Sequence, residues 1–317
     1  TARVVAHMPY MEHELARLLT LIVGPPPERH IGSYCKNPYP CPFKSYCEAS
    51  DTDYPVAYLP NGWRVAQTLL AQGIADIRDI PADALSSETH QRVRRVTIAG
   101  EAELLPGASR LLAALPYPRY YLDFECIQFA IPIWPGTQPY EQLPFQWSCH
   151  IENDDGHLAH EAFLDTSGED PRRAFAETLL AACGEQGPII VYNQAFEKRI
   201  IKELAACNPD LAPRLLALNE RVFDLLPVVK HHYYHPAMKG SWSIKNVLSC
   251  LVPELSYKDL GRVQEGMMAQ AVYLEIITSK LSGDETEASR QDLLDYCELD
   301  TLAMVKIVAK FLHYSEH

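Results

Sequence analysis

The stretch YYLDFEC, residues 120–126, decides the fold because it has the composition of a buried strand and yet carries two acids. Tyr, Leu and Phe favour a β-strand, on which residues two apart project from the same face. Asp123 and Glu125 are therefore expected to point together. Two neighbouring carboxylates in an apolar setting repel each other and lose hydration unless a cation lies between them. A solvent-facing sheet surface is the alternative explanation for this pair taken alone.

Two later stretches place further polar side chains where a site would be built. In IIVYNQAFEKRII an apolar strand runs into Asn193, and Glu197 follows in the first turn of a helix. The carboxyl end of a strand is where α/β folds assemble their sites. In LLDYCELDTLAMV, Tyr296 and Asp300 are four residues apart, hence on one face of a helix. The order strand, strand-to-helix turn and late helix favours one shared site for hard cations such as Mg²⁺ or Mn²⁺, which prefer oxygen ligands.

The hydrophobic periodicity of the chain changes near Pro118. Before this residue the spacing is helical over 1–20 and 62–105, with an irregular Pro-, Gly- and Cys-rich segment between. After it come three strands, a helix, a short apolar strand and more helices, which predicts an α/β fold with antiparallel strands beside a more central parallel one. We expect three regions, namely residues 1–55 with the Cys-rich loop, 56–117 as a helical linker and 118–317 as the α/β domain.

The charge and hydropathy of the chain restrict its partners. The formal net charge of −13 over 317 residues argues against a broad, sequence-independent nucleic-acid footprint, although an enzyme that holds one strand end is still compatible with it. No apolar run of about 18 residues predicts a membrane span. The first residues have neither the basic start nor the apolar core of a signal peptide, so we expect a soluble, cytoplasmic protein.

The stretches LDFE, VYNQAFE and YCELD together resemble the three exonuclease motifs of the DEDD superfamily, in the subclass with Tyr in the third motif. Ribonuclease D and the proofreading domain of family A DNA polymerases belong to that subclass. The resemblance covers residues 118–317 and includes weaker matches at RVFDLLPVVK and GSWSIKNVL. More specifically, the chain is similar to bacterial proteins of the DUF2779 group, which join such a domain to the tail of a RecB-like nuclease.

The resemblance implies a ribonuclease H-like fold and a metal-dependent 3′→5′ exonuclease that shortens single-stranded DNA or RNA. Asp123, Glu125 and Asp300 would hold two Mg²⁺ or Mn²⁺ ions, which Glu197 would join directly or through water, while Tyr296 would orient the attacking water. The second motif normally ends in Asp, and no other acid near Asn193 is expected to substitute for Glu197. The longer arm of Glu197 would favour Mn²⁺ or lower the activity. The alternative is a weak or inactive nucleic-acid-binding module of a larger RecB-like nuclease.

A second metal site is predicted in the Pro-rich segment. HIGSYCKNPYPCPFKSYC sets Cys35, Cys41 and Cys47 at six-residue intervals, and in a reducing compartment such a trio indicates metal rather than disulfides. The spacing differs from that of a zinc finger. It resembles the C-terminal cysteine trio of RecB-like nucleases with an iron–sulfur cluster, whose fourth ligand lies upstream. For an iron–sulfur cluster, the expected partner is a missing upstream region of the same polypeptide. The alternative is a Zn²⁺ site that His30 completes.

Overall fold

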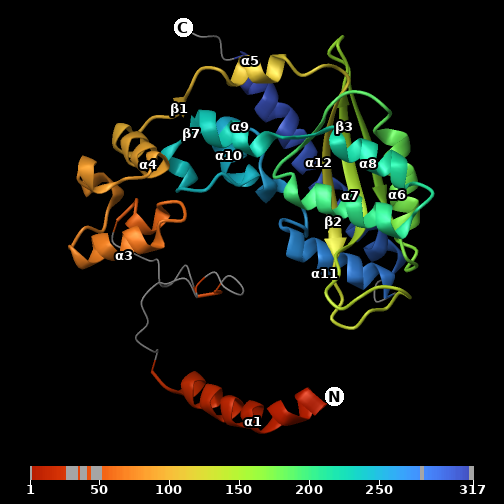
Figure 1. Ribbon diagram of the computed structural model, residues 1–317, viewed down its shortest axis with the longest axis horizontal. Helices are drawn as coiled ribbons and strands as arrows, with labels where there is room; N and C mark the ends of the chain where they lie inside the picture. Colours follow the sequence, from red (N-terminus) through yellow and green to blue (C-terminus); the bar gives the residue numbers. More distant parts are fainter. Residues whose placement is uncertain (1, 26–34, 36–40, 44–51, 279–281, 314–317) are drawn as a thin grey trace. The chain divides into compact units, whose positions relative to one another are not determined.

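The computed structural model of the chain describes residues 2–25, 35, 41–43, 52–278 and 282–313 (Figure 1). The chain separates into two compact units, Thr1–Arg94 and Arg95–His317. This division lies at a different place from the regions expected from the sequence, 1–55, 56–117 and 118–317, and those regions stay predictions.

The first unit is mainly helical where it is described. It contains α1 (Ala2–Val23), α3 (Trp63–Ala71) and most of α4 (Glu88–Ala99), with 3₁₀ turns at Val56–Tyr58, Ile77–Asp79 and Ala82–Ala84. Helix α1 confirms the helix predicted over residues 1–20, and its apolar side chains, such as Met8 and Leu15, are exposed. The buried apolar side chains of the unit come from the later segments and include Leu59, Leu69 and Ile77.

The predicted cysteine trio is described only in part. The backbone N–H of Cys41 donates to the carbonyl of Cys35 at 2.9 Å, and the Cys35 side chain is buried. Cys47 and His30 lie outside the described residues. An iron–sulfur cluster or Zn²⁺ at this trio therefore stays a prediction.

The second unit is built on a mixed five-stranded sheet, which confirms the predicted α/β fold. The strands lie in the order β4-β3-β2-β5-β6, with β3 antiparallel to both of its neighbours and β5 parallel to β2 and β6. Their bounds are Arg119–Ile127 for β2, Leu143–Glu152 for β3, Leu158–Leu164 for β4, Ile189–Val191 for β5 and Val222–Asp224 for β6. The three-residue β6 was not predicted, because a run of that length carries no periodicity.

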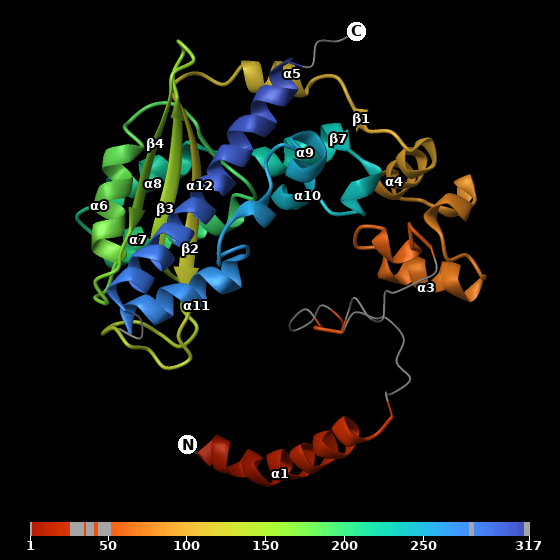
Figure 2. The ribbon, with the colours of Figure 1, turned by 180° about the vertical axis from the view of Figure 1, so that it is seen from behind.

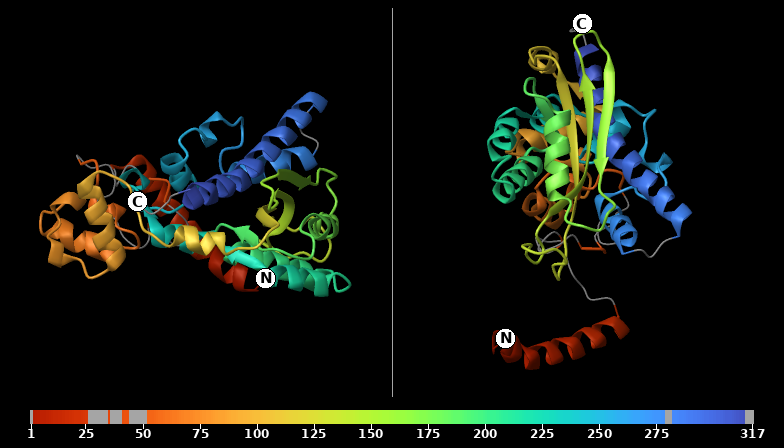
Figure 3. Two further views of the ribbon diagram at one scale, coloured as in Figure 1. Left: turned by 90° about the horizontal axis from the view of Figure 1, so that it is seen from above. Right: turned by 90° about the vertical axis from the view of Figure 1, so that its right-hand side faces the viewer.

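Helices cover both faces of this sheet (Figure 3). One face packs against α6 (Arg172–Ala182), α7 (Ala195–Cys207) and α8 (Ala212–Glu220). The opposite face packs against α10 (Ile244–Leu251), α11 (Gly266–Ile277) and the long α12 (Gly283–His313), which crosses the sheet in the view from behind (Figure 2).

The middle strand β2 divides its side chains between these two layers. Alternate residues enter the core under α6, α7 and α8, namely Tyr120, Leu122, Phe124 and Cys126. The intervening Asp123 and Glu125 therefore face the α12 layer, as the period of two requires. The Phe124 ring packs edge-to-face on Phe175 at 5.1 Å, so this aromatic residue between the acids belongs to the core.

Several shorter elements complete the second unit. They are β1 (Glu103–Leu104), α5 (Ala108–Ala113), α9 (Leu225–His232), β7 (Tyr233–Tyr234) and the 3₁₀ turns Pro236–Met238 and Tyr257–Asp259. Strand β1 pairs with β7, and α5 packs along α12. No helix in the described part of the chain is both long and apolar enough to cross a membrane.

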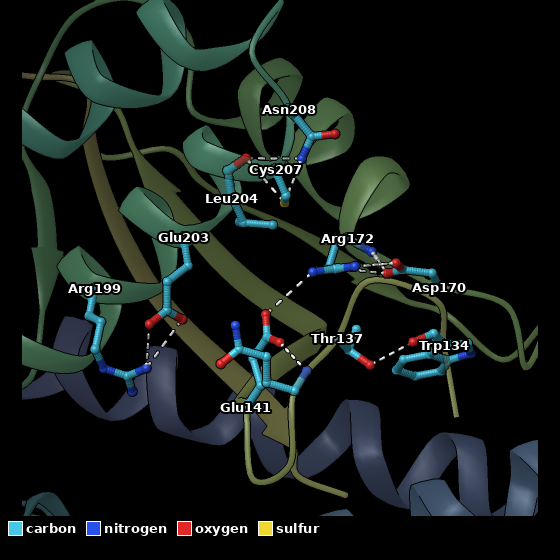
Figure 4. Close-up of polar contacts among 11 residues, drawn as sticks. Trp134, Thr137, Glu141, Asp170, Arg172, Arg199, Glu203, Leu204, Cys207 and Asn208 are labelled. Carbon is cyan, nitrogen blue, oxygen red and sulfur yellow. Dashed lines mark hydrogen bonds and ion pairs between the residues drawn. The ribbon is translucent and has the colours of Figure 1, made fainter. Parts of the chain in front are cut away.

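The connection from β2 to β3 is fixed by polar contacts (Figure 4). The Arg172 guanidinium lies between Asp170 and Glu141, with N–O distances of 2.6 and 3.4 Å. Glu141 also accepts the backbone N–H of Gln138 at 2.7 Å, and the Trp134 indole N–H donates to the Gly168 carbonyl at 2.9 Å. The loop that leaves the acidic end of β2 is thus tied to the start of α6.

Candidate metal centre

Three of the four predicted acids come together on the α12 side of the sheet. Asp123 and Glu125 extend from β2, and Asp300 extends from α12. One carboxylate oxygen from each lies within 4.8 Å of the other two. Glu125 and Asp300 are buried, whereas Asp123 is partly exposed. We call Asp123, Glu125 and Asp300 the acidic cluster.

The acidic cluster resists full ionisation. Burial, followed by the charges of Asp300 and Glu125, raises the pKa of Asp123 well above its ordinary value. Burial and then the charge of Asp300 raise the pKa of Glu125 to about 8. Burial raises the pKa of Asp300 to about 6, against the lowering effect of a hydrogen bond from Tyr257. When like charges lie this close together in a buried site, a bound cation stabilises them strongly because it removes their mutual repulsion.

Glu197 lies outside this cluster, although the sequence predicted it as a fourth ligand. It lies in the first turn of α7, where the helix dipole favours a negative charge. Its side chain is 2% exposed, and its Oε2 has no hydrogen-bond partner among the described residues. Burial raises its pKa to about 8, and its own charge contributes to the raised pKa of Asp123. Glu197 is therefore close enough to act on the cluster electrostatically and keeps one unsatisfied oxygen.

A further acid, Asp224, lies at the strand-to-helix turn, where it caps a helix and stands outside the acidic cluster. Asn193 adopts a left-handed backbone conformation with φ 77°, which Asn tolerates better than most residues, and its N–H donates to Asp224 Oδ1 at 2.9 Å. The same oxygen accepts the N–H of Leu226 at 3.0 Å and caps α9. Because β5 and β6 are parallel neighbours, their carboxyl ends meet at one edge of the sheet. Asp224 is thereby brought next to Asn193, 31 residues earlier in the chain, and is used there as a cap.

Two tyrosines flank the acidic cluster, of which the sequence predicted one. Tyr296 precedes Asp300 by one turn of α12 and is buried, and burial followed by the charge of Asp300 raises the pKa of its phenol. Tyr257 donates its hydroxyl hydrogen bond to Asp300 Oδ1 at 2.5 Å. The two rings are 6.2 Å apart in an edge-to-face arrangement. Both phenols stay protonated at neutral pH and can orient an oxygen, but neither is a base.

Lys245 is a further residue of the site that sequence reasoning missed. It lies in the first turn of α10, and its ammonium is 4.8 Å from the Tyr257 ring centre and 5.0 Å from that of Tyr296. Its charge lowers the pKa values of Glu125 and Asp300 against the effect of burial. The segment GSWSIKNVL is only a weak motif match in the sequence, since nothing local shows that its Lys meets acids more than 50 residues away in both directions.

A second polar cluster lies between β3, β4 and the same helix α12. Thr301 Oγ1 is 2.8 Å from His150 Nδ1 and 2.9 Å from Ser148 Oγ, and Ser148 Oγ is 2.9 Å from His160 Nε2. Burial, followed by the charge of His160, lowers the pKa of His150 to about 4. We call Ser148, His150, His160 and Thr301 the hydroxyl–imidazole cluster. Its two hydroxyls and the imidazole nitrogens that face them are all hydrogen-bonded without any ligand.

Comparison with known proteins supports one part of the resemblance seen in the sequence. Residues 120–243 match the family described as Domain of unknown function (DUF2779), which confirms the similarity to that group over this range. This range contains Asp123, Glu125 and Glu197 and ends before Asp300. The match carries no activity, so the DEDD and RecB-like resemblances stay hypotheses.

Three curated proteins are similar to the chain, and all three bear the name of uncharacterized proteins. One from Mycoplasma pneumoniae is 28% identical over 209 residues, covering 60% of this chain and 31% of the relative. One from Ureaplasma parvum is 27% identical over 248 residues, covering 71% and 36%. One from Mycoplasma genitalium is 27% identical over 210 residues, covering 60% and 31%. The chain thus spans about a third of the length of these relatives. No solved structure matches it significantly.

Proposed function

We propose that the chain is a metal-dependent 3′→5′ exonuclease that shortens single-stranded DNA or RNA, similar to the Tyr-containing subclass of the DEDD superfamily. The observation that carries the proposal is the acidic cluster. Two carboxylates from the middle strand and one from α12 converge within 4.8 Å, with Tyr296 one helical turn from Asp300. These are the elements and the residue types that the motif resemblance assigns to that reaction.

The residues present suit Mg²⁺ or Mn²⁺. The cluster offers only carboxylate oxygens, which hard divalent cations prefer, and its raised pKa values favour a cation over three bare charges. The unsatisfied Glu197 Oε2 is a further oxygen beside Asp123 that a metal-held water would satisfy. When bound, a pair of such ions would activate a water and stabilise the leaving oxygen of a phosphodiester.

The protein's own groups would orient the reactants. Tyr296, whose phenol stays protonated, would hold the attacking water by a hydrogen bond, and Tyr257 would fix Asp300 through its 2.5 Å contact. The water oxygen bonds to phosphorus while the bond between phosphorus and the 3′-oxygen breaks. The 3′-oxygen takes up a proton and remains on the shortened strand, and the released nucleotide carries a 5′-phosphate.

The test is digestion of 5′-labelled single-stranded DNA and RNA of equal sequence with Mg²⁺, Mn²⁺ or EDTA. Asp300→Asn is compared with the matched control Asp295→Asn, an exposed Asp on the same helix. We expect a ladder that shortens from the 3′ end only with metal. Asp300→Asn should slow it about a thousandfold, because several kcal/mol of transition-state stabilisation are lost, while the control is unchanged.

Intact strands in every lane would contradict the exonuclease. If the chain then still bound single strands without divalent metal, the alternative of a weak or inactive binding module would be favoured. The position of Glu197 outside the acidic cluster is the observation on its side. The ratio of DNA to RNA cleavage by the wild-type chain identifies the substrate class in the same gel.

A further inference from the structure

We propose that Lys245 is the phosphate-binding residue of this site. It contacts the non-bridging oxygens of the phosphate that the water attacks. After cleavage it still binds the same phosphate, which is now the 5′-phosphate of the nucleoside monophosphate product. The proposal rests on the proposed function, and it adds a residue that neither the motifs nor the relatives assign.

The position of Lys245 in its helix is unfavourable unless it has anionic neighbours. Helix α10 begins after Ser243, whose hydroxyl accepts the N–H of Asn246, and Lys245 is its second residue. A positive charge in the first turn is repelled by the helix dipole. The free N–H groups and the dipole of the same turn attract anions. The lysine and the helix terminus therefore both attract a phosphate that lies against this turn.

The ammonium is held in one place rather than extended into solvent. It lies over the faces of Tyr257 and Tyr296, at 4.8 and 5.0 Å, where a cation is attracted by the ring electrons. It also donates to the Gln264 carbonyl at 2.5 Å, just before α11. An ammonium has three N–H groups, and within the described part of the chain this is the hydrogen bond it makes. Two donors thus remain for a ligand.

These contacts place the ammonium beside the acids. Tyr257 is hydrogen-bonded to Asp300, Tyr296 precedes Asp300 by one turn, and the charge of Lys245 acts on both Glu125 and Asp300. Two divalent ions more than balance the three carboxylates, so the loaded cluster together with Lys245 attracts an anion. Lysine is a common point-charge partner of phosphate, as in P-loops.

A purely structural explanation exists and makes a different prediction. If Lys245 serves only as a counter-ion for the acids, its removal changes metal binding and nothing else. If it binds phosphate, its removal has opposite effects on two ligands. Loss of its charge relieves repulsion of a cation at the acidic cluster, while loss of its N–H groups weakens the hold on a phosphate.

The experiment measures both ligands by calorimetry on the full chain, using Lys245→Gln, Lys245→Arg and the control Lys258→Gln. Lys258 is exposed and lies in the neighbouring 3₁₀ turn. The probes are Mn²⁺ alone, then thymidine 5′-monophosphate and thymidine at saturating Mn²⁺.

For Lys245→Gln we expect Mn²⁺ to bind severalfold more tightly. The monophosphate should bind at least tenfold more weakly, with thymidine unchanged. Lys245→Arg keeps most of the monophosphate affinity, and the control matches wild type.

Monophosphate binding within twofold of wild type in Lys245→Gln would overturn the proposal, as would a wild-type chain that binds no monophosphate. Thermal unfolding of each variant confirms that it is folded. A Lys245-dependent monophosphate site in a chain that cuts no strand would support the phosphate assignment and contradict the exonuclease. Strand cleavage with unchanged kinetics in Lys245→Gln would support the exonuclease and contradict the phosphate assignment.

Discussion

The acidic cluster and the hydroxyl–imidazole cluster are neighbours of opposite character. Thr301 follows Asp300 on α12, and Ser148 on β3 pairs with Asp123 on β2. Both clusters are enclosed between the sheet and one helix. In one, donors and acceptors match and the hydrogen bonds are complete without a ligand. In the other, three acceptors of like charge converge. An unmatched set of buried polar groups, rather than burial of polar groups as such, therefore indicates a binding site.

The pKa values of the two clusters express the same contrast. Burial favours the neutral form in both, so it raises the pKa of Glu125 to about 8 and lowers the pKa of His150 to about 4. For His150 the neutral ring is the form that fits the cluster's hydroxyls. For the acids, the neutral form relieves both burial and the repulsion between neighbouring carboxylates. Metal binding should therefore change the properties of the acidic cluster and leave the hydroxyl–imidazole cluster unaffected.

The largest expected difference is in activity. Glu125→Gln removes a proposed ligand and should lower the metal-dependent release of nucleotides about a thousandfold, whereas Ser148→Ala should keep it within about threefold. Initial rates on a 5′-labelled strand with Mn²⁺ measure both variants. Equal losses would show that the two clusters work as one unit and would remove the distinction drawn between them.

Metal should also stabilise the fold through the acidic cluster alone. At about one hundred times its dissociation constant, Mn²⁺ adds about 2.7 kcal/mol, which raises Tm by roughly 5–10 °C for a domain of this size. Asp123→Asn should abolish the increase, Thr301→Val should preserve it, and EDTA should reverse it. Differential scanning fluorimetry over a Mn²⁺ series gives the comparison. An increase that persists in Asp123→Asn would place the metal elsewhere in the chain.

The pH dependence of stability in EDTA should carry the signature of the acids. The folded-state pKa of Glu125, about 8, lies above its ordinary 4.5, so its contribution is complete below pH 4.5 and is lost as the pH rises through 8. Between pH 6.5 and 8.5 Glu125 should lower the free energy of unfolding by about 2 kcal/mol, and Glu197, whose pKa burial also raises to about 8, should add a fall of about the same size. His150 changes the free energy of unfolding by only about 0.4 kcal/mol there, in the opposite direction, since its lowered pKa costs stability mainly as the pH falls from 6.5 through 4. Urea titrations at the two pH values test this, and Glu125→Gln should remove about half of the slope, while saturating Mn²⁺ should also reduce it. A slope unchanged in Glu125→Gln would assign it to other groups.

The smallest expected effect belongs to the hydroxyl–imidazole cluster. Thr301→Val keeps the shape of the side chain but leaves Ser148 and His150 each without one partner, which should cost about 1–2 kcal/mol. Urea unfolding at pH 7.5 measures the loss, and Mn²⁺ affinity should stay at the wild-type value. A matching loss of Mn²⁺ affinity would mean that this network positions Asp300.

The periodicity of the sequence predicted which side chains share a face within a single strand or helix. The period of two on β2 placed Asp123 and Glu125 on one face, and the spacing of four placed Tyr296 and Asp300 on one face of α12. The mixed sheet followed from the order of strands and helices.

What the sequence could not predict depends on which elements become neighbours. Asp224 reaches Asn193 through the pairing of β6 with β5, and Tyr257 and Lys245 reach the acids through the packing of loops and of α10. Glu197 lies on the predicted turn, yet it is not among the acids whose oxygens converge. Its distance from them depends on how α7 packs on the sheet, which no local pattern records.

The acidic cluster joins parts of the chain that are made at different times. Asp300 follows Glu125 by 175 residues, and α12 brings the third acid to the two on β2. At a synthesis rate of about 5–20 residues per second, Asp300 is added about 10–35 s after the strand is complete. A chain still on the ribosome therefore carries two of the three acids without the third. On the proposed function, a nuclease assembled this way has no complete centre with which to cut the messenger that encodes it until α12 has emerged and docked.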